Sequence, residues 1–468
     1  MLSSFLALTP CALASDLPSL GNASSRVISI EQEKKLGQAW LRSLRGQAKT
    51  FQHPIVESYF SELVYSLAPY SEVQDKNFSF VILDSKALNA FAVPGSIIGI
   101  NAGLFIHAPS EQEFASVLAH ELAHISQRHY ARRLEQQQFS TPLTFAGLLA
   151  SVLVAATAGS EAGLAAMAST QALAVEKQLS FSRQNEEEAD RLGITTLYEA
   201  GYDPRAMPIM FERMYRQTRI QGGRLPEYLS THPLSENRVA DTRNRASLYP
   251  KKTYSNSLEY ALCQAIIINY YAESEAAAEN YFRAILATNE PSSHDSATFG
   301  LALSLGTREP SEAVALLTRL QSKYPYQISI TSSLGEALFN KGETEKALSL
   351  LREQLQRNPE NYTLSIYLVD GLTKLGRYNE ANSILKPLSR KHHDKPLVWY
   401  LLAENQGKLD NIDAVHQARA EYFVLKNQLE KALEQLRFAK SKTENTVTQN
   451  IIEQRISEVL QLKKDSPF

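Results

Sequence analysis

Residues 110–134 read SEQEFASVLAHELAHISQRHYARRL, and this stretch decides how the first half of the chain folds. Its apolar residues recur at the spacing of one helical face, which predicts an amphipathic helix over residues 110–137. Ser110 followed by Glu113 has the pattern of a capping box, so the helix is expected to begin at this serine.

The same stretch contains the pattern H-E-x-x-H. On a helix, His120 and His124 lie about 40° apart and one turn up the same face, so both imidazoles can bind one metal ion. Glu121 follows the first histidine directly, and its carboxylate can therefore reach a water beside that ion. Two nitrogen ligands, one base and one open coordination position are typical of a zinc hydrolase. A buried helix with two structural histidines is the alternative.

A catalytic zinc ion needs a third protein ligand, and residues 185–190 (NEEEAD) are the best donor. Glu186 and Asp190 share one face of a helix, so one can bind zinc while the other accepts a hydrogen bond from a ligand histidine. Glu187 and Glu188 are expected to face solvent. The alternative is that the whole acidic run is a solvated helix face.

His129 is not expected to bind the metal. It lies nine residues after His120, about 180° around a continuous helix, and so faces away from the H-E-x-x-H histidines. We interpret it as a solvated or packing residue.

The composition is that of an ordinary soluble protein. The chain has 468 residues, a formal net charge of −2, 44% hydrophobic residues and 21% charged residues, which allows two or three domains. This charge balance gives no reason to propose nucleic acid or an anionic membrane as the main partner. The two cysteines, Cys11 and Cys263, provide neither a disulfide framework nor a cysteine zinc site, so histidines and carboxylates must supply any ligands. Cys263 is expected to be an inert core residue.

Two apolar segments bear on the relation to membranes. Residues 1–14 (MLSSFLALTPCALA) resemble a secretory signal with a small-residue cleavage site, so we expect export. Residues 142–158 are uncharged, but they are alanine-rich and shorter than the roughly 20 residues of a membrane span. A buried or surface-lying helical hairpin over residues 142–174 is the favoured interpretation, with at most peripheral membrane contact.

Periodicity predicts the other elements of the first half. Residues 26–70 read as amphipathic helix capped by Ser29, and residues 183–200 as a second polar helix. Residues 78–83 alternate like a strand. The apolar run at residues 97–100 is expected to be an edge strand beside the metal-binding helix, where it could pair with an extended peptide.

Beyond residue 250 the sequence repeats with a period of about 34 residues. The recurring prolines, alanines, leucines and glycines are Pro291, Pro325, Pro359, Ala313, Ala347, Ala381, Leu317, Leu351, Leu385, Gly342 and Gly376. Such a pattern is typical of tetratricopeptide helix pairs, which stack into a curved array with a concave face. In a later unit Lys408-Leu409-Asp410 replaces the glycine turn, and the polar sequence beyond Ser441 predicts a final capping helix. An irregular helical domain is the alternative.

The motifs together resemble those of the M48 metallopeptidases. In that family H-E-x-x-H is followed by E-x-x-A-D, as at residues 186–190. The family pattern N-A-F-A-x-P-G is matched at residues 89–95, although this chain has Ser96 where a second glycine often follows. His232-Pro233 with Arg238 is similar to the H-P-x-x-x-x-R element of the family.

The resemblance implies one zinc ion per chain. The implied ligands are His120, His124 and Glu186, with Glu121 as general base and Asp190 as a catalytic-site residue that supports a ligand.

The role of His232 stays open between three interpretations. Its imidazole could stabilise the oxyanion as a donor, or it could occupy the fourth position on zinc, block water and make the enzyme latent. A structural histidine in the loop before Pro233 is the third possibility.

We therefore predict a mainly α protein. A zincin-like helical metallopeptidase domain with a small β-sheet at residues 15–250 is followed by an α-solenoid of tetratricopeptide repeats at residues 251–468. The resemblance to secreted M48 peptidases with such repeats implies a periplasmic zinc endopeptidase of a Gram-negative cell. It would hydrolyse misassembled outer-membrane proteins and aid their assembly, with the repeats recruiting the β-barrel assembly machinery.

Two other interpretations stay open. The chain could be a chaperone-like repeat-binding protein with a latent zinc site. It could also be a membrane-embedded M48 relative in which residues 142–158 are inserted.

Overall fold

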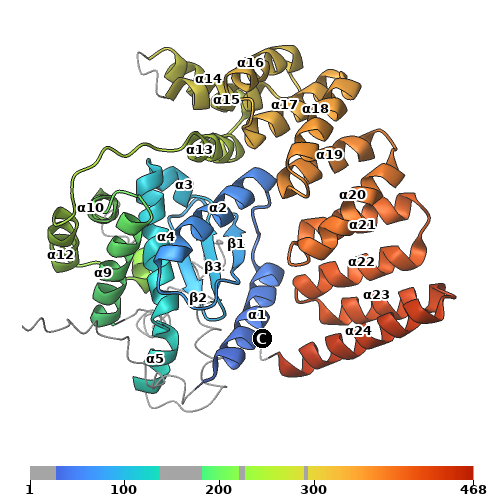
Figure 1. The fold of residues 1–468 in the computed structure, drawn as a ribbon, viewed down its shortest axis with the longest axis horizontal. Helices are drawn as coiled ribbons and strands as arrows, with labels where there is room; N and C mark the ends of the chain where they lie inside the picture. The colour runs from blue at the N-terminus through green and yellow to red at the C-terminus, as the bar shows by residue number, and fades with distance from the viewer. Residues whose placement is uncertain (1–27, 137–152, 154–181, 221–226, 289–292, 467–468) are drawn as a thin grey trace, which may run out of the picture.

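The computed structural model describes residues 28–136, 153, 182–220, 227–288 and 293–466. The predicted signal at residues 1–14 lies outside them, as does the predicted hairpin at 142–174 apart from Leu153. Within the described ranges, no helix combines the length and the apolarity needed to cross a membrane. The chain is mainly helical around one small sheet, as predicted (Figure 1).

Two helices and a 3-10 turn precede the sheet: α1 (Ile30–Gln47), α2 (Pro54–Leu67) and η2 (Ala68–Tyr70). Ser29 caps α1 with both bonds of a capping box, but the prediction of one helix over residues 26–70 is wrong. The helix is interrupted because the amide of Phe51 donates to the carbonyl of Ile82 at 2.8 Å, which draws the chain to the sheet edge. Pro54 then begins α2, since proline suits the first turn of a new helix.

The sheet has three strands, β1 (Ser79–Leu83), β2 (Ala90–Val93) and β3 (Ile97–Asn101). The strand order is β1-β3-β2, with β3 parallel to β1 and antiparallel to β2. The strand predicted at residues 78–83 is confirmed as β1. The prediction of an edge strand at 97–100 is wrong, because β3 is paired on both sides and entirely buried. The edge strand that contacts the H-E-x-x-H helix is β2.

The H-E-x-x-H pattern lies on α4 (Glu111–Ser126), which follows the short helix α3 (Leu104–His107). The helix begins as predicted, since the Ser110 hydroxyl accepts from the amide of Glu113 at 3.2 Å, although the Glu113 carboxylate turns to Arg213 at 2.7 Å. The helix does not continue to residue 137. Arg128 adopts a φ of +49°, which turns the chain into the separate helix α5 (His129–Gln136).

Among the described residues, four more helices of the N-terminal domain follow: α9 (Arg183–Glu199), α10 (Ala206–Ile220), α11 (Glu227–Thr231) and α12 (Glu236–Ser247). The predicted polar helix at residues 183–200 is thus confirmed as α9, which packs along α4. Gly193 permits this close approach, because a Cβ there would lie 3.2 Å from the backbone nitrogen of His120 and 2.8 Å from Cε of Met207. The acidic face of α9 therefore reaches the H-E-x-x-H motif.

The C-terminal half consists of antiparallel helix pairs, as the repeat period predicts. Its helices are α13 (Leu258–Tyr271), α14 (Glu275–Leu286), α15 (His294–Leu305), α16 (Pro310–Lys323), α17 (Ile328–Lys341), α18 (Thr344–Arg357), α19 (Tyr362–Lys374), α20 (Tyr378–Lys391), α21 (Pro396–Lys408), α22 (Ile412–Leu425), α23 (Leu429–Lys442) and α24 (Thr446–Asp465). The repeating alanines Ala313, Ala347 and Ala381 are fully buried, which fits a small residue where paired helices cross. α24 is the predicted capping helix.

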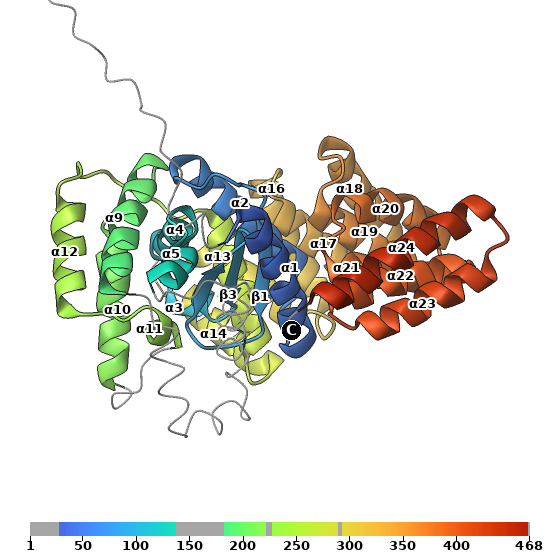
Figure 2. The ribbon, with the colours of Figure 1, turned by 90° about the horizontal axis from the view of Figure 1, so that it is seen from below.

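The repeats curve around the N-terminal domain instead of extending away from it (Figures 1 and 2). α13 packs on α2 and α3, α19 packs on α2, and α22 contacts α1. Buried residues of α13, including Cys263, belong to the same hydrophobic core as the N-terminal domain, which confirms that this thiol is a core residue. The domain boundary at residues 250/251 stays a prediction.

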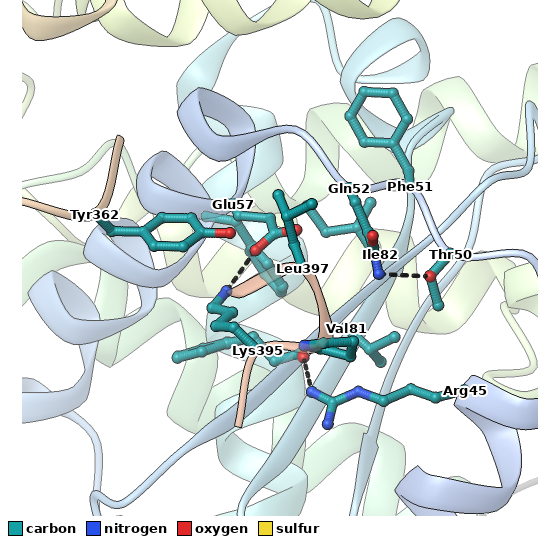
Figure 3. Close-up of a pocket in the computed structure, with 13 residues that line it drawn as sticks. Arg45, Thr50, Phe51, Gln52, Glu57, Val81, Ile82, Tyr362, Lys395 and Leu397 are labelled. Carbon is teal, nitrogen blue, oxygen red and sulfur yellow. Dashed lines mark hydrogen bonds and ion pairs between the residues drawn. The ribbon is translucent and has the colours of Figure 1, made fainter. Parts of the chain in front are cut away.

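Polar contacts fasten the two halves around a cavity of about 30 Å³, large enough for about one water (Figure 3). Lys395 of the repeats pairs with Glu57 of α2 at 2.6 Å, and both side chains are mostly buried. Further along, Lys426 donates to the backbone carbonyl of Arg45 at 2.7 Å. The N-terminal domain is therefore held against the array at two separate places.

Candidate metal centre

Four buried side chains converge between α4, α9 and the segment that follows α11. They are His120, His124, Glu186 and His232, and one ligand atom from each lies within 4.8 Å of the others. Each of the four residues is at most 2% exposed. The structure thus brings together the two histidines and the glutamate that the sequence predicts as ligands, together with the histidine whose role the sequence leaves open.

The nitrogen and oxygen atoms in this cluster approach one another closely. Nε2 of His120 lies 3.0 Å from Nε2 of His124 and 3.3 Å from Nδ1 of His232. Nδ1 of His232 also lies 3.1 Å from Oε1 of Glu186. Ring nitrogens this close need a shared proton or a shared cation between them, because two facing lone pairs or two facing protons repel each other. A single cation among the four groups meets that need.

The electrostatics of the cluster suit a cation. Burial opposes the charging of His120, but Asp190 and Glu186 more than offset it and raise the pKa of this imidazole to about 9. Burial also opposes the ionisation of Glu186, yet His232 and Arg238 hold its pKa well below the usual value. The pKa of His124 is lowered by burial, so this ring is neutral, the form in which histidine binds metals.

Arg238 on α12 contacts both carboxylates next to the cluster and the segment that carries His232. Its guanidinium donates to both oxygens of Asp190 at 2.8 Å, pairs with Oε2 of Glu186 at 2.8 Å, and donates to the carbonyl of Pro233 at 2.7 Å. Asp190 in turn approaches Nδ1 of His120 at 3.0 Å, an ion-pair distance without well-aligned hydrogen-bond geometry. The H-P-x-x-x-x-R element thus links the His232 segment to the acidic face of α9.

Glu121 lies beside the cluster with a carboxylate that is 1% exposed. Neither of its oxygens has a hydrogen-bond partner among the described residues, and Nε2 of His232 lies 3.5 Å from Oε1. A buried carboxylate without partners is costly unless it interacts with a ligand or water. Together with the four converging groups, this orphaned carboxylate fits a catalytic zinc ion.

Two residues near the cluster differ from their predicted placement. His129 is fully buried, and its Nδ1 lies 2.9 Å from Nδ1 of His124. The prediction that it faces away is wrong because it assumed a continuous helix. Glu188 was expected to face solvent, but it accepts from Nε2 of His129 at 3.1 Å and from Arg132 at 2.6 Å. Glu187 is exposed, as expected.

Sequence reasoning missed Tyr228. Its ring stacks on His232 with centroids 4.5 Å apart, and its buried hydroxyl has no hydrogen-bond partner among the described residues. A tyrosine four residues before the histidine on a short helix was the only available signal.

A cavity of about 300 Å³ opens beside the cluster. Its lining includes Ala92 and Val93 at the end of β2, His124 on α4 and Tyr130 on α5. The edge strand and the metal centre therefore share one cavity.

The fold and the site define a zinc-dependent metallopeptidase. The model of the Peptidase family M48 matches residues 54–246, which include the sheet and all four converging side chains. A tetratricopeptide repeat model matches residues 338–404.

Similar proteins extend this assignment over almost the whole chain. The "Beta-barrel assembly-enhancing protease" of Escherichia coli (strain K12) is 32% identical over 96% of this chain and 92% of its own. A "Putative beta-barrel assembly-enhancing protease" of Vibrio cholerae is 34% identical over 90% of this chain and 87% of its own. The "Mitochondrial metalloendopeptidase OMA1" of Arabidopsis thaliana is 32% identical over 36% of this chain and 32% of its own. The chain belongs to peptidase family M48 and is a zinc metalloendopeptidase with tetratricopeptide repeats.

Proposed function

We propose that this metallopeptidase works in the periplasm of a Gram-negative cell, where it hydrolyses misassembled outer-membrane proteins and aids their assembly. Relatives similar over most of the chain are named beta-barrel assembly-enhancing proteases, and residues 1–14 resemble an export signal. The concave surface of the repeats is the proposed site for recruiting partners, among them the β-barrel assembly machinery.

The convergence of four ligand atoms within 4.8 Å is the observation that carries the proposed site. We assign His120, His124 and Glu186 as zinc ligands and Glu121 as the general base. Asp190 holds His120 from behind, at 3.0 Å from its other ring nitrogen.

Bound zinc supplies a Lewis acid that activates water near neutral pH and polarises a peptide carbonyl. Glu121 takes the proton of the attacking water and passes it to the leaving amine. The substrate lies extended along the edge of β2, next to the cavity lined by Ala92 and Val93. Burial of Glu121 keeps bulk water away, which strengthens each of these interactions.

His232 is proposed as a fourth ligand that keeps the enzyme latent. Its contacts with Glu186 at 3.1 Å and His120 at 3.3 Å support this role over that of an oxyanion donor. With His232 as a fourth protein ligand, a four-coordinate zinc ion would have no position left for water. His232→Ala is then expected to raise the cleavage of unfolded casein. A fall in cleavage would favour the oxyanion donor, and no change would favour a structural role.

Replacing the base tests the peptidase mechanism directly. Glu121→Gln should keep one zinc per chain but lower casein cleavage by about 100-fold or more, because general base catalysis is lost. Glu187→Gln is the matched control, since this exposed glutamate lies outside the cluster. Metal analysis and a fluorescent casein assay measure both effects. Full activity in Glu121→Gln would refute the assigned base.

A chaperone-like binding protein with a latent zinc site is the second candidate. The position of His232 within the cluster favours it, as does a repeat array that occupies nearly half of the chain. Complementation separates the two functions: a Glu121→Gln variant that restores outer-membrane protein assembly completely would show that binding dominates.

A further inference from the structure

His129 is a fully buried histidine outside the group of converging ligands. Its ring meets the ring of His124 edge to face, with centroids 4.8 Å apart and planes at 78°. The two Nδ1 atoms are 2.9 Å apart, which is a hydrogen-bond distance. One of the two nitrogens must therefore donate a proton and the other must accept it.

The neighbours of both rings decide the direction of this bond. Nε2 of His124 faces the cluster, at 3.0 Å from Nε2 of His120, so a bound zinc ion would take the lone pair of this atom and leave the proton of His124 on Nδ1. Nε2 of His129 lies 3.1 Å from the carboxylate of Glu188, to which it donates. Nδ1 of His129 then carries a lone pair and accepts from His124. In this series of hydrogen bonds, from His124 to His129 to Glu188, every donor faces an acceptor.

The local fold brings His129 to this position. The turn at Arg128, with a φ of +49°, separates α4 from α5, and His129 is the first residue of α5. The Arg128 guanidinium is held by the Glu33 carboxylate at 2.8 Å and by the carbonyl of Ile28 at 3.0 Å. Residues at the beginning of α1 thus hold the turn in place, and the turn places His129 next to His124.

We propose that His129 is a positioning residue that fixes the tautomer and the orientation in which His124 presents Nε2 to the zinc. This inference rests on the proposed role of His124 as a ligand. The group next to Nδ1 of His120 is the Asp190 carboxylate, at 3.0 Å. The group next to Nδ1 of His124 is the neutral ring of His129. The site therefore holds its second histidine without adding another negative charge next to Glu186.

The test compares two substitutions of His129. His129→Leu removes the acceptor and keeps the bulk of the side chain, so the zinc affinity measured by competition with a chromophoric chelator should fall by about 10- to 100-fold. His129→Asn places an amide oxygen near the position of Nδ1, which can still accept from His124, and should restore most of that affinity. The control, His53→Leu, replaces a half-buried histidine at the start of α2 and should leave the zinc affinity unchanged.

A spectroscopic readout separates positioning from folding. In the cobalt-substituted protein, His129→Leu should shift the visible absorption bands of the metal, while His129→Asn and His53→Leu keep the spectrum of the unmodified chain. Equal losses of affinity in His129→Leu and His129→Asn, accompanied by equal losses of thermal stability, would show a packing role only and overturn the proposal. An unchanged affinity in His129→Leu would overturn it as well. Neither outcome depends on cleavage, so failure here is distinct from failure of the Glu121 assignment.

Discussion

The metal centre joins side chains from α4, α9, α12 and the segment after α11. In the repeats, by contrast, the side chains that meet come from helices one or two places apart in the chain. In the metal centre they are charged or polar, and each one contacts several others. In the repeats they are alanines and leucines that recur at the repeat interval, packed against their nearest neighbours. One region thus depends on charge balance among distant segments, and the other on local apolar packing.

This difference predicts different responses to substitution. Removing a charged partner from a buried network leaves the remaining charges uncompensated, so the loss spreads to residues on other helices. Removing methylene groups from an apolar core creates a cavity whose cost stays near the site.

Arg238→Ala should produce the largest effect, because it removes the cation between Asp190 and Glu186. Burial lowers the pKa of this guanidinium, but Asp190 and Glu186 more than offset that and raise it above the usual value, so the charge is present at every accessible pH. We expect a loss of about 3–5 kcal/mol in the free energy of unfolding, measured by urea denaturation with chelator present.

Saturating zinc should recover part of that loss, since the metal supplies positive charge to Glu186. Arg238→Lys keeps the charge but not the bidentate geometry, and should be intermediate. A change below about 1 kcal/mol in Arg238→Ala would contradict the view that charge balance holds this region together.

The two regions also differ in how much of them the sequence predicts. The repeats follow from periodicity alone, because every buried contact recurs at the same interval. For the metal centre, the sequence predicts His120, His124 and Glu186, since helical spacing and a family motif suffice. It does not predict His129 or the central position of β3, because these depend on the turn at Arg128 and on strand pairing. Such features arise from contacts between distant segments, which helical periodicity does not encode.

Leu351→Ala tests the apolar side of the comparison. Leu351 is fully buried on α18, and its Cδ1 lies 2.9 Å from where a Cβ on Gly335 would stand, so the packing is tight. The substitution should cost about 3 kcal/mol through the lost contacts and the cavity. Zinc content and cleavage of a short unstructured peptide should not change. A matched Leu385→Ala, one repeat further on, should behave alike, and loss of zinc from either variant would show that the regions are energetically coupled.

Two half-buried carboxyl groups with raised pKa values, those of Glu227 and Glu259, allow a test by pH. Burial raises the pKa of Glu227 from the usual 4.5 to about 7, although Asn101 and Asn89 donate hydrogen bonds that oppose the shift. The folded state therefore binds this proton more tightly than the unfolded chain does. The resulting stabilisation is complete below pH 4.5 and is lost as the pH rises through 7.

Between pH 5 and pH 8, the unmodified chain should lose about 2 kcal/mol relative to Glu227→Gln in urea denaturation. Glu259 on α13 is the counterpart in the C-terminal half, since burial raises its pKa to about 7 as well. Glu259→Gln should flatten the pH dependence by a similar amount. If only Glu227→Gln flattens the pH dependence of the free energy of unfolding, then the ionisation of Glu259 does not contribute to stability.

Asp410→Gly should give the smallest effect, and it is expected to stabilise the chain. Gly342, Gly376 and Asp410 stand at the same position of successive repeats, and all three have positive φ, of 86°, 72° and 56°. A left-handed residue with a side chain is strained by about 1 kcal/mol, whereas glycine is not, but glycine also loses more entropy on folding. The net gain should be a few tenths of a kcal/mol, seen as a higher urea midpoint. Gly376→Asp is the reverse change and should lower that midpoint. A lower midpoint in Asp410→Gly would mean that the turn is set by the exposed aspartate rather than by the backbone conformation that the repeat imposes.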